Sequence, residues 1–400
     1  MKSEAGELDY VIRVLNSPLD VSAEAWNALL ASQSQPNPFL RHEYLAALHR
    51  TGCAVPQTGW TPRFLTLWQC DDAGVMRLCA ACALYLKTHS HGEYVFDWAW
   101  ANAYAEHSLA YYPKALAAVP FTPVPGSRLM AIDNSAREAL LNMLLQWCQD
   151  QGLSSLHLLF IAQDDEAVCA QAGMMLRHNV QFHWNNDRYK DFDQFLCALT
   201  QDKRKKIRQE RRKVSDAGVA IRWSQGKDIS AQDWDFFYCC YERTYLEHGN
   251  APYLNRSFFQ SMATHMAQNW LLFVAERDDK PVASSLIGLS DCLPSDPLKH
   301  RVAYGRYWGA LERVDCLHFE LCYYQPLQWC IHHGVQRFEG GAQGEHKMAR
   351  ALLPVKTSSA HWLAHPAFAD AVQRFLEREG QGIESYLQEL DQRSPLRQRD

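Results

Sequence analysis

The chain has 400 residues, more than the roughly 250–300 at which a single hydrophobic core stops growing, so we expect two domains or two large lobes. Apolar residues make up 47% and charged residues 21% of it, with a net charge of −5, which excludes a disordered or fibrous protein. The longest apolar runs are far shorter than the roughly 20 residues of a membrane helix, so we expect no membrane span.

The thirteen cysteines do not suggest a disulfide framework, because their number is odd, the chain is long and no signal segment precedes Asp9. Free thiols are typical of a reducing compartment, and we therefore expect a cytoplasmic protein. Cys79 and Cys82 have the spacing of a metal or redox pair. They lie in an apolar run and no second pair completes a zinc site, so we assign them to a buried strand.

In the first half of the chain, hydrophobic periodicity and turn residues predict a mixture of helices and strands. Residues 71–74 predict a tight turn between two strands, and Gly52 and Gly152 are expected to end helices. The predicted helices are 22–31, 41–51 and 135–151, and the predicted strands are 11–15, 64–70, 75–87, 93–100, 129–132 and 155–160.

The second half repeats this order. Another turn with two aspartates, at 277–280, joins two strands, and Gly334 ends a helix that Pro326 should kink. The repetition indicates an internal duplication with its joint near residues 180–200, so we expect an α/β protein of two lobes, 1–185 and 186–400, the second of which ends in C-terminal helices. The predicted helices are 234–247, 255–267 and 317–333, and the predicted strands are 270–276, 281–290, 301–308 and 335–338.

Eight lysines and arginines and one glutamate lie within residues 203–213. This segment carries +7, so the rest of the chain carries −12. Its residues favour a helix on which the arginines recur at about one-turn spacing, forming a stripe that could bind several phosphates at once. A solvated helix without a ligand is the alternative. The residues assigned to phosphate binding are Lys203, Arg204, Arg208, Arg211 and Arg212.

Residues 338–350 form a second unusual segment, directly after a predicted strand. Three glycines within 340–344 would allow a ligand to approach the backbone closely, and Glu345, His346 and Lys347 bring an acid, a base and a cation together. The alternative is that the glycines only turn the chain and the charges face water.

Residues 92–104 are rich in aromatic side chains and follow His89 and His91. No further ligand accompanies the two histidines, so we interpret them as loop residues and predict no metal site. Asp97, which the pattern places in an aromatic strand, could be a buried carboxylate with a raised pKa that acts as a base. A hydrogen-bonded core aspartate is the alternative.

Several catalytic motifs are absent from the sequence. It contains no Gly-x-Ser-x-Gly elbow, no His-Glu-x-x-His, no Walker loop and no Gly-x-Gly-x-x-Gly. Hydrolase, zinc protease, nucleotidase and dehydrogenase activities therefore have no support from motifs.

Five segments resemble the bacterial FemAB-like proteins of the GNAT acyltransferase superfamily, and the resemblance covers most of the chain. It implies an α/β fold of two tandem GNAT-like lobes, each with a mixed, mostly antiparallel sheet flanked by helices. It also implies an acyltransferase, in a group that is often labelled peptidoglycan biosynthesis or recognition. The segments are 92–104, 111–114, 119–124, 181–184 and 341–347.

A more distant resemblance links the second half to the Fem ligases, which move an amino acid from aminoacyl-tRNA to the amine of a peptidoglycan precursor. In both, a basic helix precedes a strand, and a Gly-Gly segment follows later. The ligases then carry an aromatic-Lys pair, and Lys347 matches the lysine, whose proposed role is to stabilise the anionic tetrahedral intermediate. The sequence departs from this pattern at His346, which replaces the aromatic residue, and it lacks a long coiled-coil insertion.

The pyrophosphate-binding loop usual in acetyl-CoA enzymes of the superfamily is also missing, because residues 309–313 occupy its place. We therefore expect an N-acyltransferase or aminoacyltransferase that acts on an amine, including a peptidoglycan-related or peptide amine. The donor is aminoacyl-tRNA or acyl-CoA, with no tightly bound cofactor. The alternatives are an acyl-CoA-dependent GNAT N-acetyltransferase for a small amine, and a non-catalytic module that binds a muropeptide or RNA.

In this interpretation Lys347 stabilises the oxyanion, and Glu345, His346 or Asp97 accepts the proton of the amine. The remaining residues predicted to line the substrate cleft are Gly341, Gln343, Tyr304, Tyr307, Glu320 and Tyr104.

Overall fold

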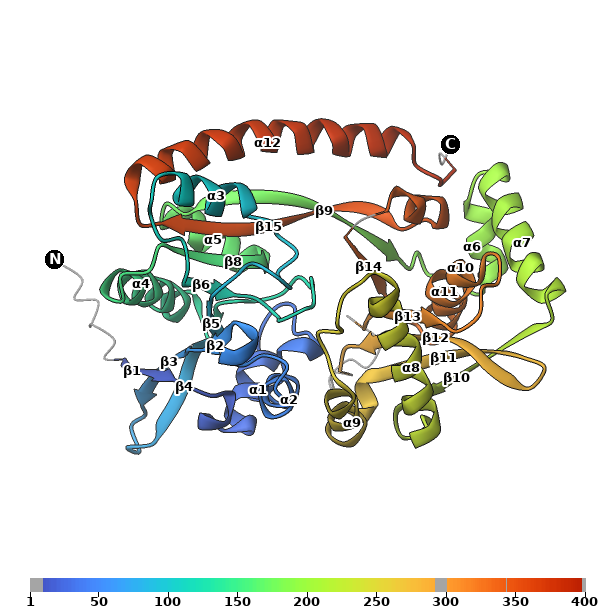
Figure 1. The fold of residues 1–400 in the computed structure, drawn as a ribbon, viewed down its shortest axis with the longest axis horizontal. Helices are drawn as coiled ribbons and strands as arrows, with labels where there is room; N and C mark the ends of the chain where they lie inside the picture. Colours follow the sequence, from blue (N-terminus) through green and yellow to red (C-terminus); the bar gives the residue numbers. More distant parts are fainter. Residues whose placement is uncertain (1–9, 292–300, 343, 398–400) are drawn as a thin grey trace. The chain divides into compact units, whose positions relative to one another are not determined.

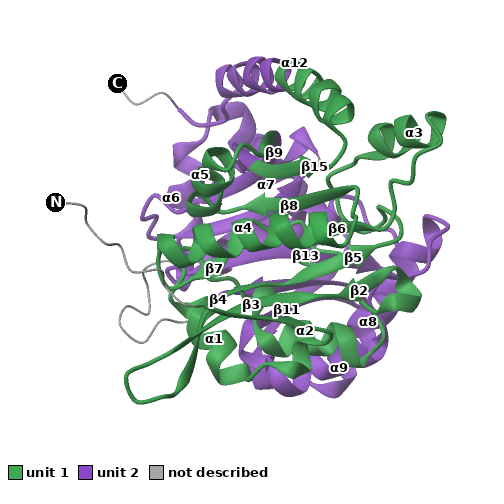
Figure 2. Cartoon of the chain, turned by 90° about the vertical axis from the view of Figure 1, so that its left-hand side faces the viewer, with its two compact units in different colours: residues 1–177, 358–379 green, residues 178–357, 380–400 purple. Residues whose placement is uncertain are grey.

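The structure is a computed structural model that describes residues 10–291, 301–342 and 344–397 (Figure 1). The chain divides into two compact units, coloured in Figure 2. Unit 1 comprises Met1–Arg177 and Ser358–Glu379, and unit 2 comprises His178–Thr357 and Gly380–Asp400. These units differ from the predicted lobes, because the chain returns to unit 1 through its last strand and the first half of its last helix.

Unit 1 contains two sheets in which antiparallel pairing dominates. The smaller has the strand order β1-β3-β4-β7, and the larger has β2-β5-β6-β8-β15, where β6 and β8 are parallel. The strands are β1 (Val11–Leu15), β2 (Trp60–Pro62), β3 (Phe64–Cys70), β4 (Met76–Cys82), β5 (Leu84–Lys87), β6 (Lys114–Ala117), β7 (Met130–Ala131), β8 (Ser155–Ile161) and β15 (Leu353–Leu363).

The helices of unit 1 bury one side against these sheets. Ser22 caps α1 by accepting a hydrogen bond from the backbone of Ala25. In α4, Leu140, Leu144 and Cys148 follow the helical period and pack into the core with strands β3, β4 and β8. The helices are α1 (Ala23–Ala31), α2 (His42–Arg50), α3 (Trp98–Glu106), α4 (Asn134–Asp150) and α5 (Gln163–Gln171).

Unit 2 contains a sheet of strand order β10-β11-β12-β13-β14-β9. Its pairs are antiparallel except β13 and β14, which are parallel, so each unit has a parallel pair within a mostly antiparallel sheet. The strands are β9 (Met175–Asn185), β10 (Val219–Gln225), β11 (Trp270–Arg277), β12 (Lys280–Leu289), β13 (Val302–Ala310) and β14 (Arg337–Ala342).

Helices flank both faces of this sheet. On the edge strand β10, Arg222 pairs with Asp233 of α8, whereas the next residue, Trp223, contacts Trp329 of α11, so these helices lie on opposite faces. The helices are α6 (Phe192–Ala198), α7 (Gln201–Asp216), α8 (Ala231–Glu247), α9 (Arg256–His265), α10 (Leu317–Phe319), the π-helix η6 (Glu320–Tyr324), α11 (Gln325–His332), the 3-10 helix η7 (Glu345–Arg350) and α12 (Pro366–Gln392), which begins in unit 1.

The predicted fold class is confirmed, and most predicted elements are present within a few residues. The predicted strand at 93–100 is wrong, because α3 begins at Trp98. Its alternation of large and small residues imitates a strand, but Trp100 and Tyr104 lie one helical turn apart and are both buried. At the predicted kink, η6 forms a π-helical turn just before Pro326.

Candidate functional site

The parallel strands β13 and β14 separate to form a small cavity in unit 2. Residues Val302–Tyr304 of β13 pair with Arg337–Glu339 of β14. Beyond Tyr304, β13 continues to Ala310 without pairing with β14. A cavity of about 130 Å³ lies where they diverge. Its lining includes Gly305, Arg306, Tyr307 and Trp308 of β13, His318 of α10, Cys322 and Tyr323 of η6, Gly340 of β14, and Lys347 of η7.

Lys347 is buried at this cavity. Its ammonium donates hydrogen bonds to the carbonyl oxygens of Ala342, at 2.8 Å, and Gly341, at 3.5 Å. Burial, helped by the nearby Arg306 guanidinium, lowers the pKa of Lys347 to about 8. Gly340 leaves room here, because a Cβ atom at that position would lie 2.3 Å from the side chain of Leu352 and 3.0 Å from the carbonyl oxygen of Phe182, so that neighbouring atoms would have to shift.

Arg306 supplies a second cation to the cavity wall. Its guanidinium donates to the carbonyl oxygens of Gly305 and Glu339 and lies 3.5 Å from the buried carboxylate of Glu339. Glu339 also pairs with Arg337 and lies opposite His183 in the sheet. Burial lowers the pKa of His183 to about 4, so this histidine is neutral at pH 7.

His318 faces the cavity among aromatic rings. Its ring centroid lies 5.3 Å from that of Trp308 and 5.6 Å from that of Tyr323. Within the described residues, neither ring nitrogen has a hydrogen-bond partner. Burial, with His346, Arg350 and Lys347 nearby, lowers the pKa of His318 to about 4, which leaves a free base at neutral pH.

His346 and Glu345, the two residues that precede Lys347 in the sequence, do not line the cavity. His346 is exposed and contacts the hydroxyl of Tyr323 at 3.2 Å, outside the cavity lining. Glu345 is also exposed and holds the end of α12, since it accepts hydrogen bonds from Tyr386 and Arg393, each at 2.9 Å. The sequence adjacency of the three residues therefore does not place them together in space.

Of the other residues predicted to line the cleft, some lie at the cavity and others do not. Tyr307 lines the cavity, and Tyr304 is buried in the paired part of β13. Gly341 adopts a positive φ of 75° and offers its carbonyl to Lys347. Gln343 lies outside the described residues.

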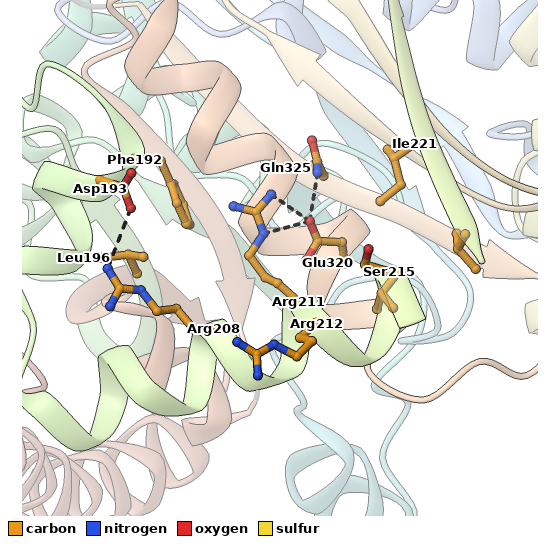
Figure 3. A pocket seen from close by; sticks show the side chains of 12 residues that line it. Phe192, Asp193, Leu196, Arg208, Arg211, Arg212, Ser215, Ile221, Glu320 and Gln325 are labelled. Atoms are coloured by element: carbon orange, nitrogen blue, oxygen red, sulfur yellow. Dashed lines mark hydrogen bonds and ion pairs between the residues drawn. The ribbon is translucent and has the colours of Figure 1, made fainter. Parts of the chain in front are cut away.

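The basic helix α7 is confirmed and lines a separate pocket of about 540 Å³ (Figure 3). Arg208, Arg211 and Arg212 line it, whereas Lys203 and Arg204 lie one turn or more earlier on α7. Within the described chain, Lys203, Arg204 and Arg212 have no ion-pair partner. Arg212 is exposed and Lys203 and Arg204 are partly buried, so the phosphate-binding prediction has uncompensated charge to act through.

Glu320 belongs to this basic pocket and does not line the Lys347 cavity. It is buried, and its Oε1 accepts hydrogen bonds from Arg211 at 3.1 Å and from Gln325 at 2.8 Å, as Figure 3 shows. Glu320 and the pair Cys322 and Tyr323 all lie on η6, yet Glu320 lines the basic pocket and the other two line the Lys347 cavity.

Asp97 and Tyr104 lie in unit 1, in a buried polar cluster. The ammonium of Lys114 contacts Asp97 and lies 2.7 Å from Glu93, and the hydroxyl of Tyr111 donates to Asp97 at 2.6 Å. Burial of Asp97 would raise its pKa, but the ammonium of Lys114 holds that pKa below its usual range. The expected raised pKa is wrong, because an opposite charge outweighs desolvation. Tyr104 packs on Tyr111 and is buried.

Residues 10–291, 301–342 and 344–397 contain neither a candidate metal site nor a candidate membrane-spanning helix. In these ranges no group of three His, Cys, Asp or Glu side chains could hold a metal ion. No helix of the described chain combines the length and apolar character needed to cross a bilayer.

Comparison with known families settles which group the chain resembles. The FemAB-like family, described as peptidoglycan biosynthesis/recognition, matches residues 17–398. The chain belongs to the FemAB-like family. No curated protein matches the sequence.

Solved structures share the fold of this FemAB-like protein at low identity. The C-terminal domain of a putative lysylphosphatidylglycerol synthetase from Agrobacterium fabrum is 11% identical, with a TM-score of 0.52 over 88% of this chain and 94% of that one. L-PGS from Bacillus licheniformis is 11% identical, with a TM-score of 0.50 over 89% and 97%. A conserved protein of unknown function from Bacteroides thetaiotaomicron is 10% identical, with a TM-score of 0.50 over 88% and 99%. At such identities the likeness concerns the fold alone.

The chemistry available to this FemAB-like protein in unit 2 is a buried cation beside a neutral imidazole. An ammonium of this kind can stabilise developing negative charge, and a free imidazole can accept a proton. Sequence reasoning missed His318, Cys322 and Arg306. The spacing of His318 and Cys322, one turn apart on a predicted helix, was the signal that could have indicated a shared surface.

Proposed function

We propose that this FemAB-like protein is an enzyme that transfers an activated acyl group to an amine in the Lys347 cavity. The observation that supports this most is the ammonium of Lys347, buried where β13 and β14 separate, with its pKa lowered to about 8. At pH 7 it remains mostly protonated, in surroundings where its charge acts more strongly than in water.

The reaction would proceed by attack of a neutral amine on the acyl carbonyl carbon. A C–N bond forms, the carbonyl oxygen becomes an oxyanion, and the ester or thioester bond then breaks to release the alcohol or thiol. Two carbonyl oxygens hold the Lys347 ammonium, and its third N–H can donate to the oxyanion. His318 would accept the proton that the amine nitrogen loses and pass it to the leaving group.

His318 replaces the proton acceptors that the sequence suggested. Glu345 is held by Arg393 and lies outside the cavity lining, and Asp97 is paired with Lys114 in unit 1. His346 is exposed beside Tyr323. Among the ionisable groups that line the cavity in the described chain, His318 is the one whose lowered pKa makes it a free base at neutral pH.

The donor we favour is aminoacyl-tRNA, with acyl-CoA as the alternative, because the exposed cations of α7 suit a phosphate-rich donor. Either donor would place the protein in the cytoplasm. The family description supports an acceptor amine on a peptidoglycan-related or peptide substrate. Its word "recognition" also leaves a second candidate, a non-catalytic module that binds a muropeptide or RNA.

The test is incubation of the purified protein with labelled aminoacyl-tRNA or labelled acyl-CoA, each with and without a peptidoglycan-precursor peptide bearing a free amine. We expect faster loss of the acyl ester and formation of an amide with one donor. The Lys347→Met variant should lose this turnover while retaining donor binding. If neither donor is consumed and the peptide still binds, the non-catalytic candidate is correct.

A further inference from the structure

Trp223 is a large aromatic side chain that remains 48% exposed on the edge strand β10. Its indole makes edge-to-face contacts with Trp329, at a centroid distance of 6.2 Å, and with His333, at 5.6 Å. His333 in turn stacks on Trp329 at 4.0 Å. These contacts hold the indole in one orientation while about half of its surface faces solvent.

Trp223 lies on the same side of unit 2 as the basic pocket. Val219 and Ile221 line that pocket, and Trp223 follows them on the same face of β10, because alternate residues of a strand point the same way. Gln325 also lines the pocket, and Trp329 lies one turn later on α11. Strand β10 and helix α11 thus both place the exposed indole on the side of the sheet where the pocket lies, beyond the lining residues Ile221 and Gln325 that Figure 3 labels.

The surface of α7 that lines this pocket has a strong excess of positive charge. Arg211 is compensated by Glu320, and Arg208 lies 3.8 Å from Asp193 in an exposed pair of little energetic value. In the part of the chain that the structure describes, Arg212 and Lys213 have no ion-pair partner. A further guanidinium, that of Arg301, lies 5.5 Å from the ring of Trp329.

We propose that the basic pocket and Trp223 together bind a single-stranded nucleic acid, with the phosphates on Arg208 and Arg212 and a base stacked on the indole of Trp223. A basic groove that tracks the backbone, with an aromatic side chain on which a base stacks, is the general solution for binding single strands. A duplex cannot use this indole, because its bases are already stacked.

This inference rests on the proposed function, because the proposed donor, aminoacyl-tRNA, carries the single-stranded segments that would bind here. It goes further by naming a base-stacking residue and the strandedness that the pocket selects. It also separates the charge of α7, which any polyanion can use, from the indole, which only a base can use.

The experiment measures equilibrium binding of three probes by the full chain: a fluorescently labelled six-residue oligoadenylate, a double-stranded RNA, and inorganic polyphosphate. For Trp223→Ala we expect about tenfold weaker binding of the oligoadenylate, which corresponds to about 1.4 kcal/mol and lies in the usual range for base stacking. Binding of polyphosphate and of the duplex should not change. Trp223→Phe should restore most of the loss.

Matched variants complete the design. Arg208→Gln with Arg212→Gln should weaken all three probes, because it removes phosphate contacts. Trp98→Ala removes another tryptophan of comparable exposure, 38%, in unit 1 and should change nothing. Unchanged oligoadenylate binding by Trp223→Ala would overturn the inference, as would an equal loss for polyphosphate.

The two proposals fail separately. Binding of the oligoadenylate that depends on Trp223, without any acyl transfer, would contradict the proposed function and support this inference. Acyl transfer from aminoacyl-tRNA at an unchanged rate and affinity in Trp223→Ala would support the proposed function and contradict this inference. Coenzyme A serves as a competitor, and displacement of the oligoadenylate by coenzyme A, lost in Trp223→Ala, would identify the bound group as a nucleotide and support base stacking.

Discussion

Glu210 of α7 and Arg350 of η7 form a buried ion pair, with 2.7 Å between Oε2 and Nη2. The hydroxyl of Tyr324 donates to the same carboxylate and accepts from Nε of Arg350 at 3.1 Å. Arg350 also donates to the carbonyl oxygen of His346 at 2.7 Å. The helix that carries the arginines predicted to bind phosphate is therefore joined, through side chains, to the turn that carries Lys347.

Removing one partner of this pair should destabilise unit 2. We expect Glu210→Ala to cost about 3–5 kcal/mol, because it leaves the Arg350 guanidinium buried without its counter-charge. The measurement is the free energy of unfolding in urea. The double variant Glu210→Met with Arg350→Met should lose much less, since it leaves no unpaired charge, and an equal loss would show that packing and not charge dominates.

Lys347 should impose an upper pH limit on acyl transfer. Its pKa is lowered to about 8, so the ammonium is lost as the pH rises through 8, and the rate should fall there. Lys347→Met should reduce kcat by about 10²–10³-fold, the usual effect of removing one oxyanion donor. Lys347→Arg keeps a cation at high pH and should lose the limit near pH 8. A wild-type rate that is constant up to pH 10 would contradict the role of the ammonium.

The same pKa predicts how stability depends on pH. Because the pKa of Lys347 is lower in the folded state than in the unfolded state, the unfolded chain binds more protons between about pH 8 and 10.4. The contribution of Lys347 to the free energy of unfolding should therefore rise with pH across this window. The free energy of unfolding of wild type, relative to that of Lys347→Met, should therefore be larger at pH 10 than at pH 7, as measured by urea unfolding of both proteins.

His318→Gln should lower kcat by about 10²-fold with little change in KM, if the imidazole accepts the proton of the amine. Because the pKa of His318 is about 4, the wild-type rate should not depend on this histidine's titration between pH 5 and 7. His346→Gln tests the sequence-based alternative, and we expect it to retain activity within a few-fold. Steady-state kinetics of both variants decide between the two histidines.

Asp97 should prove to be a structural residue. Asp97→Asn removes one of the two carboxylates that pair with the buried Lys114, leaving Glu93, and should lower the free energy of unfolding by about 1–3 kcal/mol. Since the pKa of Asp97 is lowered on folding, its contribution is complete above the unfolded value of about 3.9 and is lost as the pH falls below it. Folded Asp97→Asn protein, assayed at low temperature, should keep its rate of acyl transfer. A large loss of kcat in folded protein would instead support a catalytic base.

The periodic elements of the chain could be predicted because local spacing determines them. The hairpins at 71–74 and 277–280 and the glycine-stopped helices need only neighbouring residues for their recognition. The basic segment at 203–213 was likewise recognisable as a helix from composition and charge. The long strands β9 and β15 were not predicted, because their pairing partners β14 and β8 lie far away in the sequence. The C-terminal helices expected in the second lobe are one helix, α12, whose first half belongs to unit 1.

The site depended on tertiary structure for a simple physical reason. By itself, the sequence determined the α/β fold class and the charge of α7, which follow from local pattern and residue type, and its resemblance to the Fem ligases singled out Lys347 as a candidate. Only the folded chain decided that Glu345 and His346 lie outside the lining of the Lys347 cavity, that Glu320 faces the arginines, and that His318 shares the cavity. Burial and the position of opposite charges set these roles and their pKa values, and both arise from contacts between strands and helices that the linear order does not contain.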